Sequence, residues 1–216
     1  AEDLYGYALC IREEIYASDH PMVLATKNNI AQVYASEERY GEAISLFETV
    51  IREYCENSTE DSAFLAAVYD NLSTAYREME RYEDAIDICT EGLNIRKNIY
   101  GKRSLDYAIS LNNLALIYYE MGILNNAADI FSEALAIKKE TLPEIHGQIS
   151  IGYFNLGLVY DKLHRDNEAL ENYRASMEID NELEAYEDVL LTAEYIAEIY
   201  ERNDMPEDAE AYRTLC

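Results

Sequence analysis

The sequence repeats itself every 42 residues, and this period restricts the fold more than any other feature of the chain. A six-residue motif that runs from Asn to Tyr begins at positions 29, 71, 113 and 155, so each copy starts 42 residues after the previous one. A fifth copy begins 40 residues later, with Tyr195 in place of the Asn. A constant period of this length is typical of repeat architectures, in which each repeat is one supersecondary unit that packs on its neighbours.

A second pattern keeps the same step and indicates that every repeat contains two helices. In all five copies the small residue of the motif is followed twelve residues later by an alanine. The pairs are Ala31 and Ala43, Ser73 and Ala85, Ala115 and Ala127, Gly157 and Ala169, and Ala197 and Ala209. Apolar residues recur every three or four positions, as in Leu65, Val68 and Leu72, which is the spacing of an amphipathic helix. We therefore expect antiparallel helix pairs that approach closely at these small residues.

The large side chains of the repeats are predicted to be packing residues. Phe47, Phe131 and Tyr173 recur at one position and are expected to wedge against the next repeat. The tyrosine that ends each motif is expected to fill the same niche in every copy, because it keeps helical spacing with the core positions. These tyrosines are Tyr34, Tyr76, Tyr118, Tyr160 and Tyr200.

Capping and turn signals divide the chain into about eleven helices. Pro21, Ser62, Ser104 and Pro206 follow polar stretches and suit helix starts, and Gly122 suits a left-handed C-cap. The predicted helices lie near 1–17, 22–37, 40–56, 61–79, 82–99, 104–121, 124–141, 145–163, 166–181, 185–202 and 206–216. The predicted fold class is all-α, with one domain over 1–216. Its repeat units are 22–60, 61–103, 104–144, 145–184 and 185–216, and 1–21 is the second helix of a preceding unit.

The charge balance disfavours nucleic acid and membrane partners. The 216 residues include 43 Asp and Glu but only 17 Lys and Arg, which gives a net charge of −26. Nucleic acid and anionic lipid are bound through Lys and Arg, so we expect neither partner. No run approaches the ~20 apolar residues of a membrane span. A basic partner would be steered toward the chain, although solubility alone also explains the acidity.

The cysteines predict a reducing environment. Cys10, Cys55, Cys89 and Cys216 are far apart and show no CxxC pairing. They are interpreted as reduced packing residues rather than as disulfide or metal ligands. A cytoplasmic location is therefore predicted.

The order of large apolar, small, Tyr, Ala and aromatic residues over 22–216 resembles the tetratricopeptide repeat. The period of 42 instead of about 34 residues, the His20-Pro21 connector and the segments Asn28-Asn29-Ile30-Ala31 and Asn112-Asn113-Leu114-Ala115 are similar to the kinesin light chain type. The later connectors Arg103-Ser104 and Ile145-His146-Gly147 lack the His-Pro pair. The resemblance implies a right-handed α-α superhelix, the tetratricopeptide solenoid, in which the first helix of each repeat faces the concave side.

The first helices are predicted to line a groove that binds an extended peptide. Asn29, Asn71, Asn113 and Asn155 form a ladder along them, and each amide can both donate and accept hydrogen bonds to a peptide backbone. The resemblance implies the same role, since family members of this type use Asn here for main-chain contacts. The alternative is that these amides bond neighbouring helices and set the stacking.

The predicted groove changes from polar to apolar to acidic along the chain. Leu116, Tyr119, Phe154 and Leu158 would form an apolar anchor pocket if they are exposed, and the alternative is burial by a neighbouring repeat. We expect the ligand to run across the first four repeats, with an apolar side chain near Phe154. The complete predicted site is Asn28, Asn29, Asn71, Arg77, Asn112, Asn113, Leu116, Tyr119, Phe154, Asn155, Leu158 and Glu194.

No catalytic, metal or cofactor site is predicted. The three histidines, His20, His146 and His164, lie in different connectors and share no helix face with other ligand residues. Neither a phosphate-binding loop nor a nucleophile motif occurs. Lys27, Arg77, Lys162 and Arg202 are not grouped as a clamp for a peptide carboxylate.

Three functions are consistent with the sequence. The first is a scaffold or adaptor module that binds a protein or peptide in its groove. The second is the sensory part of a larger regulator, in which a peptide shifts the curvature of the superhelix. The third is a structural array that self-associates through its terminal helices, 1–17 and 206–216.

Overall fold

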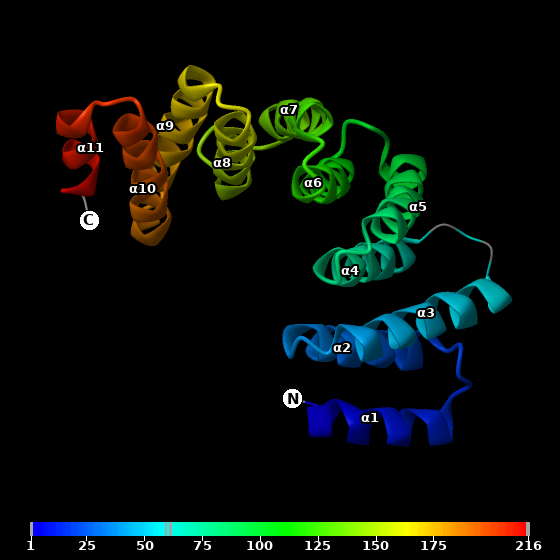
Figure 1. The fold of residues 1–216 in the computed structure, drawn as a ribbon. Coiled ribbons are helices and arrows are strands. Elements are labelled where there is room, and N and C mark those ends of the chain that lie inside the picture. The colour runs from blue at the N-terminus through cyan, green and yellow to red at the C-terminus, as the bar shows by residue number, and fades with distance from the viewer. Residues whose placement is uncertain (1, 59, 61, 215–216) are drawn as a thin grey trace. The chain divides into compact units, whose positions relative to one another are not determined.

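The described part of the chain consists of helices joined by short connectors. The computed structural model describes residues 2–58, 60 and 62–214, in which eleven helices and no strand occur. The helices form two compact units, within Ala1–Lys102 and Arg103–Cys216. The first unit holds α1 (Glu2–Ile15), α2 (Pro21–Ser36), α3 (Tyr40–Asn57), α4 (Ala63–Glu78) and α5 (Tyr82–Tyr100). The second holds α6 (Leu105–Glu120), α7 (Leu124–Thr141), α8 (Gly147–Lys162), α9 (Asp166–Glu182), α10 (Tyr186–Arg202) and α11 (Pro206–Arg213) (Figure 1).

The predicted all-α array of antiparallel helix pairs is confirmed, and the helix ends differ by a few residues. α4 begins at Ala63 rather than near 61, and α8 begins at Gly147 rather than near 145, because a capping residue precedes each. α1 ends at Ile15, and α11 ends at Arg213. The start near 61 and the end near 216, together with Cys216, lie outside the described residues. The single domain over 1–216 and its repeat boundaries stay predictions.

One connector position caps the first helix of four repeats. His20 Nδ1 accepts a hydrogen bond from the Met22 N–H (3.2 Å), and His146 Nδ1 accepts one from the Gln148 N–H (3.0 Å). Ser62 and Ser104 cap their helices in the same way through their hydroxyl oxygens. These contacts satisfy amide groups that the first turn of a helix leaves without partners. The position recurs every 42 residues, so capping keeps the register of the repeat.

A left-handed residue ends the first helix of every repeat. The predicted C-cap Gly122 is confirmed, with φ 76°, but the equivalent residues of the other repeats are not glycines. They are Glu38, Glu80, His164 and Asp204, with φ between 56° and 60°. The N–H of the next residue donates to the carbonyl of the repeat tyrosine, as from Arg81 to Tyr76 O (2.9 Å). This is the six-to-one bond of a Schellman-type helix end.

An arginine that follows this turn covers the repeat tyrosine in three repeats. The guanidinium carbons of Arg39, Arg81 and Arg165 lie 4.1, 4.4 and 4.6 Å from the ring centroids of Tyr34, Tyr76 and Tyr160. Stacking of a cation on an aromatic face is favourable. The tyrosine thus joins the helix end to the turn, which agrees with its predicted packing role.

Inside each repeat, a small residue on the first helix makes room for the second helix. All five small residues and all five alanines of the predicted pairs are buried. The fourth repeat shows how close this approach is, because a Cβ on Gly157 would lie 2.5 Å from two ring carbons of Tyr173. Tyr173 is itself completely buried. Only glycine at 157 therefore fits a tyrosine at 173.

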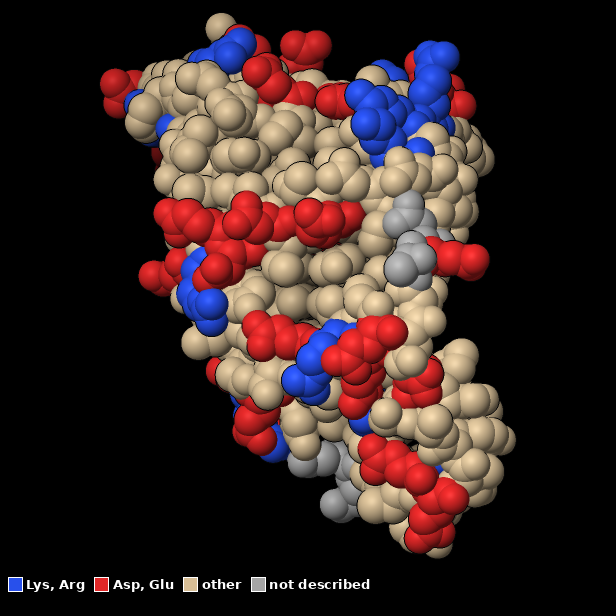
Figure 2. Space-filling model, turned by 90° about the vertical axis from the view of Figure 1, so that its right-hand side faces the viewer, with Lys and Arg blue, Asp and Glu red and all other residues tan. Residues whose placement is uncertain are grey.

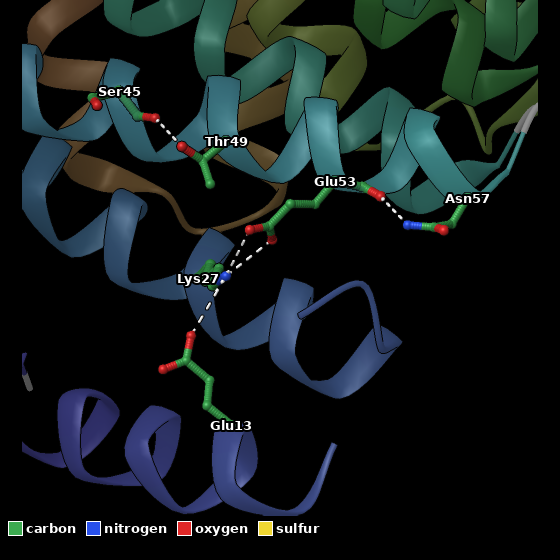
Figure 3. Close-up of polar contacts among 6 residues, drawn as sticks. All are labelled: Glu13, Lys27, Ser45, Thr49, Glu53 and Asn57. Carbon is green, nitrogen blue, oxygen red and sulfur yellow. Dashed lines mark hydrogen bonds and ion pairs between the residues drawn. The ribbon is translucent and has the colours of Figure 1, made fainter. Parts of the chain in front are cut away.

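Lys27 joins three helices of the first unit. Its side chain comes from α2, and its ammonium lies 2.9 Å from a Glu53 carboxylate oxygen on α3 and 3.5 Å from one of Glu13 on α1 (Figure 3). The Glu53 carbonyl also accepts a hydrogen bond from the Asn57 side chain one turn later. Because Lys27 is 7% exposed, removing its partner would leave a buried charge uncompensated.

Lys138 on α7 is buried without such a partner. It is 1% exposed, and no described residue forms a hydrogen bond or ion pair with its ammonium. Burial lowers the pKa of Lys138 from 10.5 to about 8. The folded state therefore holds this proton less tightly than the unfolded chain does.

We predict that Glu80→Gly stabilises the protein. Glycine adopts positive φ without a Cβ penalty, so the free energy of unfolding should rise by about 0.5–1 kcal/mol. Urea unfolding followed by circular dichroism measures the change. The matched control is Glu83→Gly in the first turn of α5, which should lower stability by up to about 1 kcal/mol. A loss of stability in Glu80→Gly would contradict the prediction.

We predict that Gly157→Ala destabilises the protein. The new methyl group would overlap the buried Tyr173 ring, so unfolding should become easier by about 1–3 kcal/mol. Gly41→Ala is the matched control, because nothing lies within 4 Å of a Cβ at that position of α3. Thermal unfolding of both variants tests this. An unchanged melting temperature in Gly157→Ala would show that the α8–α9 packing is looser than described.

We predict that Lys138→Met stabilises the protein at neutral pH and removes part of its pH dependence. The pKa of Lys138 is lowered on folding, so the wild type gains stability as pH rises from about 8 to 10.5 and loses it as pH falls. The variant should exceed the wild type by up to about 3 kcal/mol at pH 7. This gap should narrow above pH 8. Urea unfolding at several pH values measures it.

The control for this prediction is Lys139→Met. Lys139 is the exposed neighbour of Lys138 on α7. Its substitution should keep the pH profile of the wild type. A gap between Lys138→Met and wild type that stays constant from pH 7 to 10 would contradict the prediction.

Candidate functional site

The predicted site residues lie on the first helices of the repeats. α2 and α4 carry them in the first compact unit, and α6, α8 and α10 carry them in the second. Spacings of three and four residues, as from Asn112 to Leu116 and Tyr119, place side chains on one helix face. Each compact unit therefore presents its own set of these residues.

The Asn ladder links neighbouring first helices within each unit. Asn71 Nδ2 on α4 donates to Asn28 Oδ1 on α2 (3.3 Å). The second unit repeats this bond, since Asn155 Nδ2 on α8 donates to Asn112 Oδ1 on α6 (3.1 Å). Asn28 and Asn155 are each 8% exposed. The amides of Asn71 and Asn155 thus make the stacking contacts that were the predicted alternative to peptide binding.

Two further predicted asparagines remain half exposed. Asn29 on α2 and Asn113 on α6 are only partly covered. No described residue forms a hydrogen bond with either side-chain amide. Their donors and acceptors are therefore not used within the described structure, whereas the neighbouring Asn28 and Asn112 amides are used for stacking.

The predicted apolar residues are half-buried and belong to two core clusters. Leu116 and Tyr119 pack against the core around Phe131, between α6, α7 and α8. Phe154 and Leu158 pack against the core around Tyr173, between α8, α9 and α10. The ring centroid of Phe154 is 5.6 Å from that of Tyr173 and 5.4 Å from that of Tyr195. These contacts position the half-exposed Phe154 ring from three helices.

The basic residues considered as a clamp are held by different partners. Arg77 pairs with its neighbour Glu78. The Lys162 ammonium lies 4.4 Å from the Tyr119 ring centroid. Arg202 on α10 pairs with Asp161 on α8 (2.6 Å) and with Asp166 on α9 (2.5 Å). Arg202 therefore ties three helices of the second unit together.

The surface charge agrees with the acidic composition. Figure 2 shows Asp and Glu side chains spread over much of the drawn face, whereas Lys and Arg gather in a few places. The predicted Glu194 is exposed on α10, as is Glu198 one turn later. Glu201 is paired with Arg213. In the part of the chain that the structure describes, no three His, Cys, Asp or Glu residues are grouped to hold a metal ion. None of the described helices is long and apolar enough to cross a membrane.

One interior position, missed in the sequence analysis, carries a different group in each repeat. In the second repeat, Arg96 on α5 pairs with Asp70 on α4 (2.5 Å), and both side chains are about nine-tenths buried. Lys138 and Asp180 occupy the position of Arg96 in the third and fourth repeats. Aligning the copies at a step of 42 residues could have found this position, since charged residues are rare on a buried helix face.

Comparison with known proteins identifies the repeat. Three tetratricopeptide repeat models match residues 23–57, 64–140 and 152–183. A search of curated protein sequences finds no match. The matches among solved structures are close in fold, and all of those compared below are at most 20% identical in sequence.

Three solved structures illustrate this likeness. BtubC (BKLC) from P. vanneervenii has a TM-score of 0.85 at 20% identity, over 98% of this chain and 86% of that chain. The putative kinesin light chain repeats from Podosopora anserina have a TM-score of 0.77 at 19% identity, over 91% of this chain and 94% of that chain. The Rap conjugation gene regulator of plasmid pLS20, in complex with the Phr* peptide, has a TM-score of 0.70 at 18% identity. This match covers 90% of this chain and 52% of the regulator.

The family models and the helix-pair architecture agree with each other. The matched segments extend over repeats in both compact units. The chain belongs to the tetratricopeptide repeat proteins, and its fold is of the kinesin light chain type.

Proposed function

We propose that this protein-interaction module binds an extended peptide segment along the first helices of its repeats. The observation that carries the proposal is the half-exposed row on α6 and α8, where Asn113, Leu116, Tyr119 and Phe154 remain accessible. An extended peptide needs backbone partners and apolar contacts, and this row offers both. No catalytic step or cofactor is part of the proposal.

Hydrogen bonding supports different roles for neighbouring asparagines, with Asn112 and Asn155 joining helices and Asn113 available to a ligand. The bond between Asn155 and Asn112 holds α8 and α6 in register. Asn113 then lies on a rigid helix face with its amide unused among the described residues. A preorganised amide loses little entropy on binding, which favours its use as a ligand contact.

The fold supports the proposal by analogy. The Rap regulator, with its Phr* peptide, shows that a fold similar to this chain can hold a peptide. That regulator is about twice as long as the matched region, so its regulatory activity is not transferred to this chain. A scaffold or adaptor role in the cytoplasm is part of the proposal, and the sensory role remains the alternative.

The charge supports a basic partner. A net charge of −26 attracts cationic segments and repels acidic ones, with the strongest effect at low salt. The exposed Glu194 and Glu198 on α10 add to this field near the second unit's first helices. The ligand class proposed is therefore a peptide with basic residues and an apolar anchor.

We predict that Asn113→Ala weakens binding of peptides selected on the wild-type protein by about tenfold. The loss corresponds to one or two backbone hydrogen bonds. Selection from a random-peptide display library, at moderate and high salt, supplies the ligands. Fluorescence anisotropy then measures their affinities for wild type and variant.

The matched control is Asn126→Ala, which removes an exposed asparagine from the second helix α7. It should bind the selected peptides as the wild type does. Both variants should melt at the wild-type temperature. No enrichment from the library, or equal affinity of Asn113→Ala and wild type, would remove the peptide-groove proposal. Concentration-dependent mass in solution would then favour the structural, self-associating array.

A further inference from the structure

A pocket with a charged floor lies between α8, α9 and α10. Its volume is about 220 Å³. Asp180 of α9 lines it and is 5% exposed, together with Ser150, Ser176 and Thr192, which are each 1–2% exposed. The Ser176 hydroxyl lies 3.3 Å from Asp180 Oδ2 and 2.9 Å from the Ser150 hydroxyl. Polar groups from three helices thus converge at the base of the pocket.

The Asp180 carboxyl has no cationic partner among the described residues. In the second repeat, the residue equivalent to Asp180 is Arg96, and its buried charge is neutralised by an ion pair with Asp70. Asp180 stands at the position of Arg96, and Phe154 stands at the position of Asp70. The fourth repeat thus contains a buried acid where the second contains a pair. The Ser176 hydroxyl hydrogen-bonds the carboxyl without balancing its charge.

The environment disfavours the ionised carboxylate as long as the pocket has no cation. Burial raises the pKa of Asp180, and the Asp188 carboxylate on α10 acts in the same direction. The nearby Ser150 and Ser176 hydroxyls oppose the shift. A cation in the pocket would relieve this cost, because an opposite charge favours the ionised form.

The mouth of the pocket is apolar and exposed. Ile151, Leu183 and Leu191 line it and are 46%, 43% and 45% exposed. The half-buried Phe154 ring forms part of the wall. An occupant that matches both zones needs an alkyl stem at the mouth and a cationic head at the floor. Arg and Lys side chains have this construction.

We propose that this pocket binds an Arg or Lys side chain of the partner peptide, with the cation paired to Asp180 and the alkyl stem against Leu191 and Phe154. The inference rests on the proposed function for the source of the side chain. It replaces the expected apolar contact near Phe154 with an amphipathic one. Asp188 at the mouth adds negative charge along the path of the incoming cation.

A small probe tests the pocket independently of any peptide. Acetyl-arginine amide is titrated into the whole protein, and amide resonances of Ile151, Leu191 and Thr192 are followed by NMR. Saturable shifts are expected with arginine, and none with the uncharged isostere acetyl-citrulline amide. Asp180→Asn should weaken the arginine probe at least tenfold while keeping the fold, because the substitution is isosteric and removes a buried charge.

The control variant is Asp129→Asn, which removes an exposed carboxylate from α7 and should bind the probe as the wild type does. Equal shifts with citrulline, or unchanged affinity in Asp180→Asn, would overturn the inference. Stronger binding of acetyl-norleucine amide than of the arginine probe would assign the pocket to apolar side chains. Stronger binding of agmatine would assign it to a free small cation. Either result also overturns the proposal.

The library of peptides separates this inference from the proposed function. Enriched peptides that lack basic residues and bind Asp180→Asn normally would leave peptide binding intact and overturn the pocket assignment. Arginine-dependent probe binding without any enriched peptide would support the cation pocket and remove the peptide groove.

Discussion

The close approach of the two helices in each repeat is the constraint on which the other features depend. A small residue on the first helix faces an alanine region of the second, and both are buried in every repeat. Packing at interior density then leaves room for only one large side chain beside them. The fourth repeat shows the consequence, because Tyr173 requires glycine at 157. The Phe154 ring packs on Tyr173. Its position therefore depends on the absence of a side chain at Gly157.

The period and the helical spacing made the fold predictable from sequence. Every predicted helix that falls within the described residues is present, and the end of the first helix at Gly122 was recognised from its glycine. The positive φ of Glu38, Glu80 and His164 in the equivalent turns was not foreseen, because this backbone conformation is uncommon for residues other than glycine. The histidine caps at 20 and 146 were missed for a related reason: imidazole is an uncommon N-cap.

The candidate site was less predictable, since one sequence position can serve stacking or binding. The amides at 71 and 155 donate to 28 and 112, and only the geometry distinguishes them from the half-exposed amides at 29 and 113. Under the proposed function, neighbouring residues on one helix would divide the two roles, with one amide used for stacking and the next for the ligand. The sequence alone identified the ladder but not this division, because it does not report which amide lies against the adjacent helix.

The buried charged residues of the second helices show how repeats with the same architecture can acquire different surfaces. The small residues, the alanine and the apolar core positions recur from repeat to repeat, whereas the position held by Arg96, Lys138 and Asp180 varies. In the second repeat it forms an internal ion pair, whereas in the fourth it leaves a carboxylate facing a pocket. Because each repeat is stable through the same packing, such a change alters local chemistry without changing the fold. Specificity for one peptide would then arise where a repeat contains an unpaired buried charge, as at Asp180. The apolar and amide contacts of the first helices would supply affinity that is common to many peptides.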